Sequence, residues 1–142
     1  MPELPEVETV RRRLEELLRG EEIREVELRC SNLRSPIPSG LTELLNRSRV
    51  SAVGRQGKYL LIHLTCGTWL VHLGMSGRFL FGTPGSAKDA KHDHLVLRMS
   101  NGLTVRYNDF RRFGTFAICS SDALSAHPAL SRLGVDALAT DL

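Results

Sequence analysis

A run of short alternating segments between residues 49 and 119 constrains the fold more than any other feature. Within it, β-branched and aromatic residues recur at every second position, and turn residues separate the segments. The expected turns are Cys66-Gly67 and Asn101-Gly102, and the second dipeptide is typical of a type I′ hairpin. Strands are expected at 49–55, 58–65, 68–73, 77–82, 93–99, 103–108 and 113–119. Evenly spaced short strands of this kind predict a two-sheet antiparallel β-sandwich or a flattened barrel.

Helices are expected to flank this β-rich region. From Pro5 to about Arg19, apolar residues recur at helical spacing, and Gly20 is a suitable stop. Residues 22–29 alternate enough to form a further strand. A Ser/Pro-rich loop at 31–39 precedes a short helix with Ser39 as the expected N-cap and a core-facing side formed by Leu41, Leu44 and Leu45. The predicted fold class is therefore mainly β, preceded by an N-terminal α-helix.

One domain is expected for a chain of 142 residues. A polar, Gly-rich loop at 82–91 interrupts the strands. Residues 121–142 are typical of short helical turns at the start of a linker. The domain prediction is a single unit over 1–142 whose last part leads into such a linker.

Positive charge is concentrated in the middle of the chain. Residues 44–112 carry 11 basic and 3 acidic side chains, a net charge of +8, whereas residues 1–43 carry −3 and residues 113–142 carry −2. Of the 19 basic residues 16 are Arg, whose planar guanidinium suits bidentate contact with phosphate and guanine edges. This distribution indicates a polyanion such as DNA as partner. An ordinary solvated Arg-rich surface has the same composition.

Cysteine usage and hydropathy exclude several classes of protein. Cys30, Cys66 and Cys119 lie far apart without paired spacing, which argues against a disulfide framework and against a zinc site. Polar residues interrupt every apolar run, so no membrane span is expected, and the acidic N-terminus is unlike a signal peptide. We expect a cytoplasmic monomer without a cofactor or metal in this chain.

The first eight residues, Met-Pro-Glu-Leu-Pro-Glu-Val-Glu, carry the strongest chemical signal. Removal of Met1 would expose Pro2 as a secondary amine able to form an iminium ion with a sugar C1′, an electron sink for later eliminations. An α-amino group has a pKa of about 7.7 to 8, so a neutral fraction exists at physiological pH. Glu3 and Glu6 lie close enough in sequence to serve as general acids. The same residues also make an ordinary helix start.

This opening resembles that of the bacterial formamidopyrimidine-DNA glycosylase family, whose mature N-terminal proline is the Schiff-base nucleophile. Three further segments agree with the family in order and spacing: Gly57-Lys58-Tyr59-Leu60, Leu73-Gly74-Met75-Ser76-Gly77-Arg78 and Asp109-Phe110-Arg111-Arg112-Phe113-Gly114. The resemblance covers essentially the whole chain. It implies the N-terminal catalytic domain of a bifunctional DNA glycosylase and AP lyase, with damaged double-stranded DNA as partner.

The resemblance also assigns roles to catalytic residues and to phosphate-binding residues. It implies that Pro2, Glu3, Glu6 and Lys58 form the catalytic group, with Lys58 contacting the phosphate near the lesion and assisting elimination. It places His92 on a backbone phosphate and Arg112 on a phosphate or on its own loop. From the residues alone, Lys58 is equally a solvent-exposed turn lysine. His92 and His94 could suggest a metal, although no third ligand is evident.

Met75, Arg111 and Phe113 resemble the three residues that fill the hole left when a damaged nucleotide is flipped out. Extruding a base costs stacking and pairing, which an apolar wedge partly replaces, and Arg111 would hydrogen-bond the orphaned cytosine. Alternatively, Met75 and Phe113 are strand core residues and Arg111-Arg112 is a solvated pair. Leu4 and the segment Arg111–Phe113 resemble the purine-lesion branch of the superfamily rather than the endonuclease VIII branch. The implied substrates are 8-oxoguanine opposite cytosine and formamidopyrimidines, removed by glycosylase action and β,δ-elimination.

The chain departs from the family in length, because family members are about twice as long. They continue into a helix-two-turn-helix domain and a four-cysteine zinc finger, both expected to be absent here, so the family zinc has no site in this chain. A truncated, catalytically inactive DNA-binding fragment is the alternative function, and a structural β-domain is a third. If Met1 is retained, the Pro2 nitrogen is an amide and cannot attack.

Overall fold

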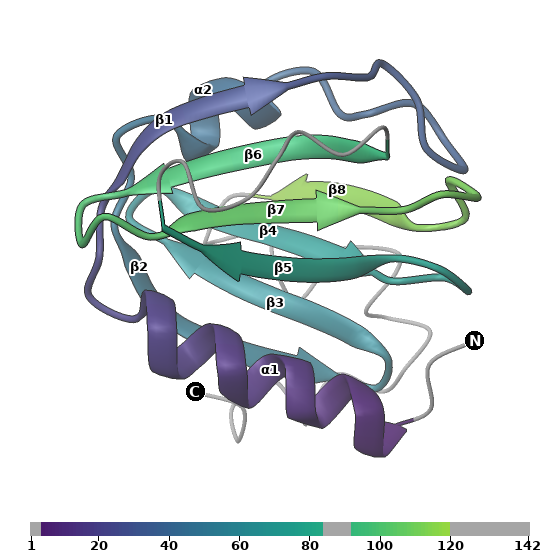
Figure 1. Ribbon diagram of the computed structural model, residues 1–142, viewed down its shortest axis with the longest axis horizontal. Coiled ribbons are helices and arrows are strands. Elements are labelled where there is room, and N and C mark those ends of the chain that lie inside the picture. Colours follow the sequence, from purple (N-terminus) through teal and green to yellow (C-terminus); the bar gives the residue numbers. More distant parts are fainter. Residues whose placement is uncertain (1–3, 84–91, 120–142) are drawn as a thin grey trace.

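Two antiparallel four-stranded sheets face each other in a β-sandwich (Figure 1). The computed structural model describes residues 4–83 and 92–119. One sheet has the order β1-β6-β7-β5 and the other β2-β3-β4-β8. The strands are β1 Ile23–Leu28, β2 Val50–Gln56, β3 Tyr59–Leu64, β4 Gly67–His72, β5 Arg78–Gly82, β6 Asp93–Met99, β7 Thr104–Asn108 and β8 Thr115–Cys119. The predicted two-sheet sandwich is confirmed, and the described strands do not close into a barrel.

An aromatic cluster joins the two sheets at the centre of the core. Trp69 of β4 lies edge-to-face against Phe116 of β8 and Phe79 of β5, with ring centroids 5.2 and 6.0 Å apart. Tyr107 of β7 makes the same kind of contact with Phe116 at 4.7 Å and with Phe79 at 5.4 Å. Such pairs add about 0.5–1.5 kcal/mol each beyond the area they bury. The cluster therefore fixes the sheets relative to each other.

Helix α1, Leu4–Leu18, covers one open side of the sandwich, between edge strands β2 and β5. Its buried residues Val7, Leu14 and Leu18 follow the helical spacing of the sequence. Arg11 donates to the carbonyl oxygen of Val53 at 3.0 Å, and Glu15 accepts from the Val53 amide at 3.2 Å. These bonds pair main-chain groups of an edge strand that would otherwise be open. The predicted first helix is confirmed.

Helix α2, Leu41–Leu45, lies on the other open side near β1 and buries Leu41 and Leu45. Two predicted boundaries near it are wrong by one residue. The N-cap is Gly40 in a left-handed conformation without a side-chain cap bond, so Ser39 does not cap the helix. Leu64 pairs with Gly67, so the β3–β4 turn consists of Thr65-Cys66 and Gly67 already belongs to β4.

The turn at Asn101-Gly102 is present, but it is not the predicted type I′ turn. Gly102 has a φ of +89°, whereas Asn101 is not among the described residues with positive φ, which a type I′ turn requires at both positions. The Gly102 amide donates to Met99 O at 3.1 Å, and the Met99 amide donates to Leu103 O at 2.9 Å. The loop thus has three residues with glycine in the left-handed position. Of the predicted loop at 82–91, only residues 82 and 83 are described. The predicted linker at 121–142 lies outside the described residues.

Candidate nucleic-acid interface

Four described segments that carry sequence-predicted site residues lie at one end of the sandwich, on the right in Figure 1. The first turn of α1, the β2–β3 turn, the β4–β5 loop and the β7–β8 loop all lie there. Exposed Glu6 belongs to the first turn of α1. Pro2 and Glu3 lie outside the described residues. The described part of the site therefore consists of the groups at this end of the sandwich.

Lys58 stands in a tight hairpin between β2 and β3. Gln56 pairs with Tyr59, which leaves Gly57-Lys58 as a two-residue loop. Gly57 has a φ of +60°, the sign that a type II′ hairpin needs at its first central position. Lys58 therefore occupies the turn position that the residues alone allowed as an alternative, and the strand predicted at 58–65 begins one residue later, at Tyr59. The Lys58 side chain is half-buried rather than fully extended into solvent.

His72, at the end of β4, is a site residue that sequence reasoning missed. Burial lowers its pKa, and the positive charges of Lys58 and Arg34 lower the pKa further. The imidazole is thus neutral near pH 7, and its Nδ1 atom accepts a hydrogen bond from the Gly74 amide at 3.1 Å. The Tyr59 ring lies edge-to-face at 5.1 Å. His72 therefore links the Lys58 hairpin to the β4–β5 loop, and the motif Leu73–Arg78 begins at the next residue without including it.

Met75 projects from the β4–β5 loop and is 53% exposed. The Gly77 amide donates to the Leu73 carbonyl oxygen at 2.8 Å, which closes the loop behind Met75. Gly74 has a φ of +62° and opens the turn. The alternative that Met75 is a strand core residue is wrong, because Met75 lies between β4 and β5.

The β7–β8 loop presents four large exposed side chains: Phe110, Arg111, Arg112 and Phe113. Phe110 is 57% and Phe113 39% exposed, although both are large and apolar. The strand predicted at 113–119 begins only at Thr115, so Phe113 is not a core residue. The Arg111 guanidinium lies 5.5 Å from the centre of the Phe110 ring. Exposed apolar groups beside arginines are typical of a binding surface.

These two loops are packed against each other. A Cβ atom added at Gly74 would lie 2.3 Å from the Phe113 carbonyl oxygen, so only glycine permits this approach. Asp109, fully buried at 0% exposure, joins the loops through its carboxylate. It accepts from the Ser76 hydroxyl, from the Tyr107 hydroxyl at 3.0 Å and from the Gly114 amide at 2.8 Å. The sequence motif contained Asp109, but its role was not predicted.

The two histidines of the His92-Asp93-His94 segment have different environments. His94 is buried, and its Nε2 atom bonds to the Asp109 carbonyl oxygen at 2.8 Å. His92 is half-buried before β6, with its ring 6.3 Å from the Phe110 ring. His94 is thus a structural partner of the β7–β8 loop, whereas His92 adjoins its exposed surface.

Some of the basic side chains between residues 44 and 112 form ion pairs with carboxylates of the same domain. Arg55 pairs with Glu8 at 3.0 Å, Arg98 with Glu25 at 3.5 Å and Arg106 with Asp93 at 3.3 Å. Within the described part of the chain, Arg111 and Arg112 form no ion pair. The β7–β8 loop therefore carries two exposed guanidinium groups that no described carboxylate neutralises.

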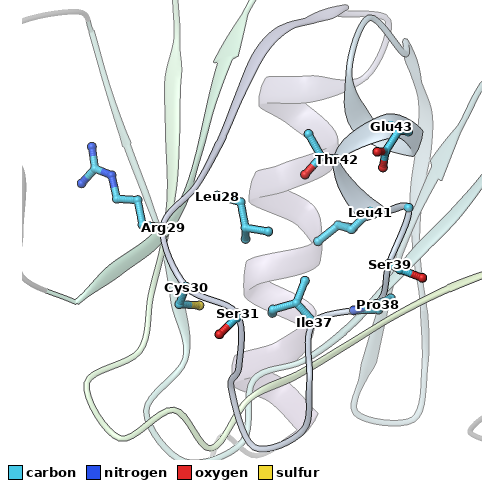
Figure 2. Close-up of a pocket in the computed structure, with 11 residues that line it drawn as sticks. Leu28, Arg29, Cys30, Ser31, Ile37, Pro38, Ser39, Leu41, Thr42 and Glu43 are labelled. Atoms are coloured by element: carbon cyan, nitrogen blue, oxygen red, sulfur yellow. The ribbon is translucent and has the colours of Figure 1, made fainter.

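A hollow of about 560 Å³ lies beside α2, with Leu28, Ile37 and Leu41 among its lining residues (Figure 2). None of the described site residues that the sequence predicts lines it. The candidate interface is instead formed by side chains that project from loops. Among the described residues, no helix is both long and apolar enough to cross a membrane.

Comparison with known proteins agrees with this arrangement. The profile of the formamidopyrimidine-DNA glycosylase N-terminal domain matches residues 1–116. Formamidopyrimidine-DNA glycosylases of Chelativorans sp. and Nitrosococcus oceani are 45% and 49% identical over 152 and 138 residues, covering 96% and 97% of this chain but 51% and 50% of theirs.

A solved structure of a Lactococcus lactis FPG mutant with Fapy-dG-containing DNA has a TM-score of 0.78 and 34% identity. The match covers 87% of this chain and 45% of that one. The chain thus spans about half the length of the curated relatives it matches. By its sequence and fold, it belongs to the formamidopyrimidine-DNA glycosylase family, of which it corresponds to the N-terminal domain.

Proposed function

We propose that this chain is the catalytic half of a DNA glycosylase that removes oxidised purines from duplex DNA and then cleaves the abasic site. The observation that carries the proposal is the exposed group of Met75, Arg111 and Phe113 on two interlocked loops. It lies at the end of the sandwich where the chain enters α1 two residues after Pro2. Family membership supports the same activity.

The exposed group suits the extrusion of a base. Flipping a nucleotide out of a duplex loses stacking and pairing worth a few kcal/mol, and apolar side chains inserted into the gap replace part of that loss. Met75 and Phe113 supply the apolar surface. The Arg111 guanidinium supplies donors for the cytosine that has lost its partner. Lys58, His92 and Arg112 bind the phosphates around the flipped nucleotide.

Pro2 performs the chemistry once Met1 has been removed. Its neutral amine attacks C1′ as the glycosidic bond breaks, the base leaves with the bonding electron pair, and the proton lost from the attacking nitrogen is passed to the base. Glu3 protonates the ring oxygen, the ring opens, and the C1′–nitrogen bond becomes an iminium. Loss of a C2′ proton then expels the 3′ phosphate, and a second elimination expels the 5′ phosphate. Glu6 shuttles protons, and Lys58 assists elimination at the phosphate.

A second candidate function is DNA binding without catalysis. It is favoured by Arg111 and Arg112, which are exposed on the β7–β8 loop and form no ion pair with the described residues. Such a protein would bind duplex DNA through these arginines with a salt-dependent affinity and leave abasic sites intact.

Borohydride trapping separates the two functions. The 142-residue chain and a fusion of it to the second half of the Nitrosococcus oceani relative would be incubated with an 8-oxoguanine:cytosine duplex. We expect the fusion to form a covalent adduct that maps to Pro2. As matched control, the same fusion with a retained N-terminal extension has an amide at Pro2 and should form none. A processed, folded fusion that binds DNA without an adduct would refute the catalytic proposal.

A further inference from the structure

We propose that Asp109 is a positioning residue that sets the three inserted side chains, Met75, Arg111 and Phe113, in one fixed arrangement before DNA binds. This inference rests on the proposed function, because it concerns how the base-extruding group is held. It assigns no contact between Asp109 and DNA.

The Asp109 carboxylate is enclosed and receives donors from three segments. The Ser76 hydroxyl of the β4–β5 loop donates to Oδ1. The Tyr107 hydroxyl of β7 and the Gly114 amide of the β7–β8 loop donate to Oδ2 at 3.0 and 2.8 Å. Hydrogen bonds to a charged group are roughly twice as strong as neutral ones. The carboxylate therefore joins two loops that lie more than thirty residues apart in sequence.

Each inserted side chain is directly coupled to this carboxylate network. Met75 precedes Ser76 in the chain, and Phe113 precedes Gly114. The Arg111 amide donates to the Ser76 hydroxyl oxygen at 3.2 Å. A shift of the Asp109 carboxylate would thus move the backbone at all three inserted positions together.

The main chain of Asp109 is itself anchored to β6 and its start. Its amide donates to the His92 carbonyl oxygen at 3.0 Å, and its carbonyl oxygen accepts from His94 Nε2 at 2.8 Å. The same carbonyl also accepts from the Arg112 amide at 3.2 Å, and Arg112 has a φ of +56°. The β6 segment therefore fixes the main chain of Asp109, and the Asp109 carboxylate fixes the β4–β5 and β7–β8 loops relative to each other.

The packing around the carboxylate leaves little room for adjustment. A Cβ atom at Gly114 would lie 1.9 Å from the Tyr107 hydroxyl oxygen, and one at Gly77 would lie 2.4 Å from it. Burial and the adjacent Asp109 raise the pKa of Tyr107 far above its ordinary value, which keeps its hydroxyl protonated as a donor. Preorganised groups held by such supporting bonds lose function when displaced by about 1 Å.

Ser76→Ala and Asp109→Asn in the fusion protein test the inference. Ser76→Ala removes only the bridge from the carboxylate to Arg111, and Asp109→Asn keeps the volume but replaces an acceptor oxygen with a donor. We expect the preference for excising 8-oxoguanine opposite cytosine over adenine to fall about tenfold in both, because Arg111 loses its alignment and a good base contact gives about 1–3 kcal/mol of discrimination. Ser51→Ala, an exposed hydroxyl on β2, is the matched control and should keep the preference.

Hydrogen exchange gives a readout that does not depend on activity. In the Ser76→Ala variant of the 142-residue chain, we expect the Arg111 amide to exchange at least tenfold faster than in the unsubstituted chain. In the Asp109→Asn variant, we expect the Arg111 and Gly114 amides both to exchange at least tenfold faster. An unchanged base preference together with unchanged exchange would overturn the inference, as would losses that merely follow the unfolded fraction. If the unsubstituted fusion excises no base, the proposed function fails, and the exchange rates alone decide whether Asp109 holds the loops.

Discussion

Gly74 and Gly102 both have left-handed backbone conformations, with φ values of +62° and +89°, but their surroundings differ. A Cβ atom at Gly74 would lie 2.3 Å from Phe113 O, whereas one at Gly102 would meet nothing within 4 Å. At Gly102, only the left-handed backbone conformation therefore requires glycine. At Gly74, the close approach of the Phe113 backbone requires it as well.

Alanine at these two positions separates the causes. Gly102→Ala should cost about 1–2 kcal/mol of unfolding free energy, the penalty of the left-handed conformation. Gly74→Ala should cost clearly more, because the Phe113 backbone must also move. Urea unfolding of the two variants measures both values. Equal losses would show that the β4–β5 and β7–β8 loops are not held in contact.

Substitution of Met75 tests whether this exposed apolar side chain contributes to base excision rather than to the stability of the fold. Met75→Ala should change the unfolding free energy by less than about 0.5 kcal/mol, as is usual at the surface. Excision of 8-oxoguanine by the fusion protein should nevertheless fall by at least tenfold.

The matched variant is Met99→Ala, which removes a buried methionine from β6. It should cost about 2–5 kcal/mol of stability, with excision per folded molecule unchanged. The reverse pattern, with Met75→Ala unstable and active, would exclude the insertion role.

At the scale of elements, Glu8 fastens α1 to β2. Its carboxylate accepts from Arg11 and Arg12 on its own helix and pairs with Arg55 of β2 at 3.0 Å. The Arg11 hydrogen bonds, followed by those of Arg55 and Arg12, lower the pKa of Glu8 to about 2. The ion pairs thus favour the charged form of Glu8 in the folded protein.

This pKa predicts how Glu8→Gln depends on pH. An unfolded glutamate has a pKa of about 4.3. The stability that the charge contributes is therefore fully present above about pH 4.3 and is lost as the pH falls through the folded pKa of about 2. Glu8→Gln should lower the melting temperature at pH 7 and converge with the unsubstituted chain near pH 2. Thermal scans between these values test it, and a pH-independent difference would contradict the ion-pair explanation.

At the scale of the whole molecule, the basic residues divide into those used by the fold and those open to a ligand. Arg98 pairs with Glu25 and Glu27 across β1 and β6, whereas Arg112 projects from the β7–β8 loop. Both are exposed and belong to the same basic stretch of sequence.

The salt dependence of DNA binding distinguishes these two groups. Each phosphate contact contributes about −0.9 to the slope of log affinity against log salt. Arg112→Gln should make the slope shallower by about one contact, and Arg98→Gln should leave it unchanged. Fluorescence anisotropy with a short duplex at several salt concentrations measures both. Equal effects would place DNA on the β1–β6 surface as well.

The sequence by itself determined the strand series and the first helix, because period-two alternation and helical spacing act over a few positions. The resemblance of its motifs to the family implied Lys58, Met75, Arg111 and Phe113 as a set. Whether Met75 and Phe113 are core or surface was left open, since alternation is the same in both cases.

Only the tertiary structure decided those points. Phe113 lies outside β8 because the strand begins where Thr115 pairs with His72. Gly40 rather than Ser39 caps α2, and Asn101 avoids the left-handed conformation. Asp109 could not be recognised as the group that joins the loops, because its partner Ser76 is 33 residues away in sequence. Local patterns encode the period of an element, but the approach of two loops depends on how the whole sandwich packs.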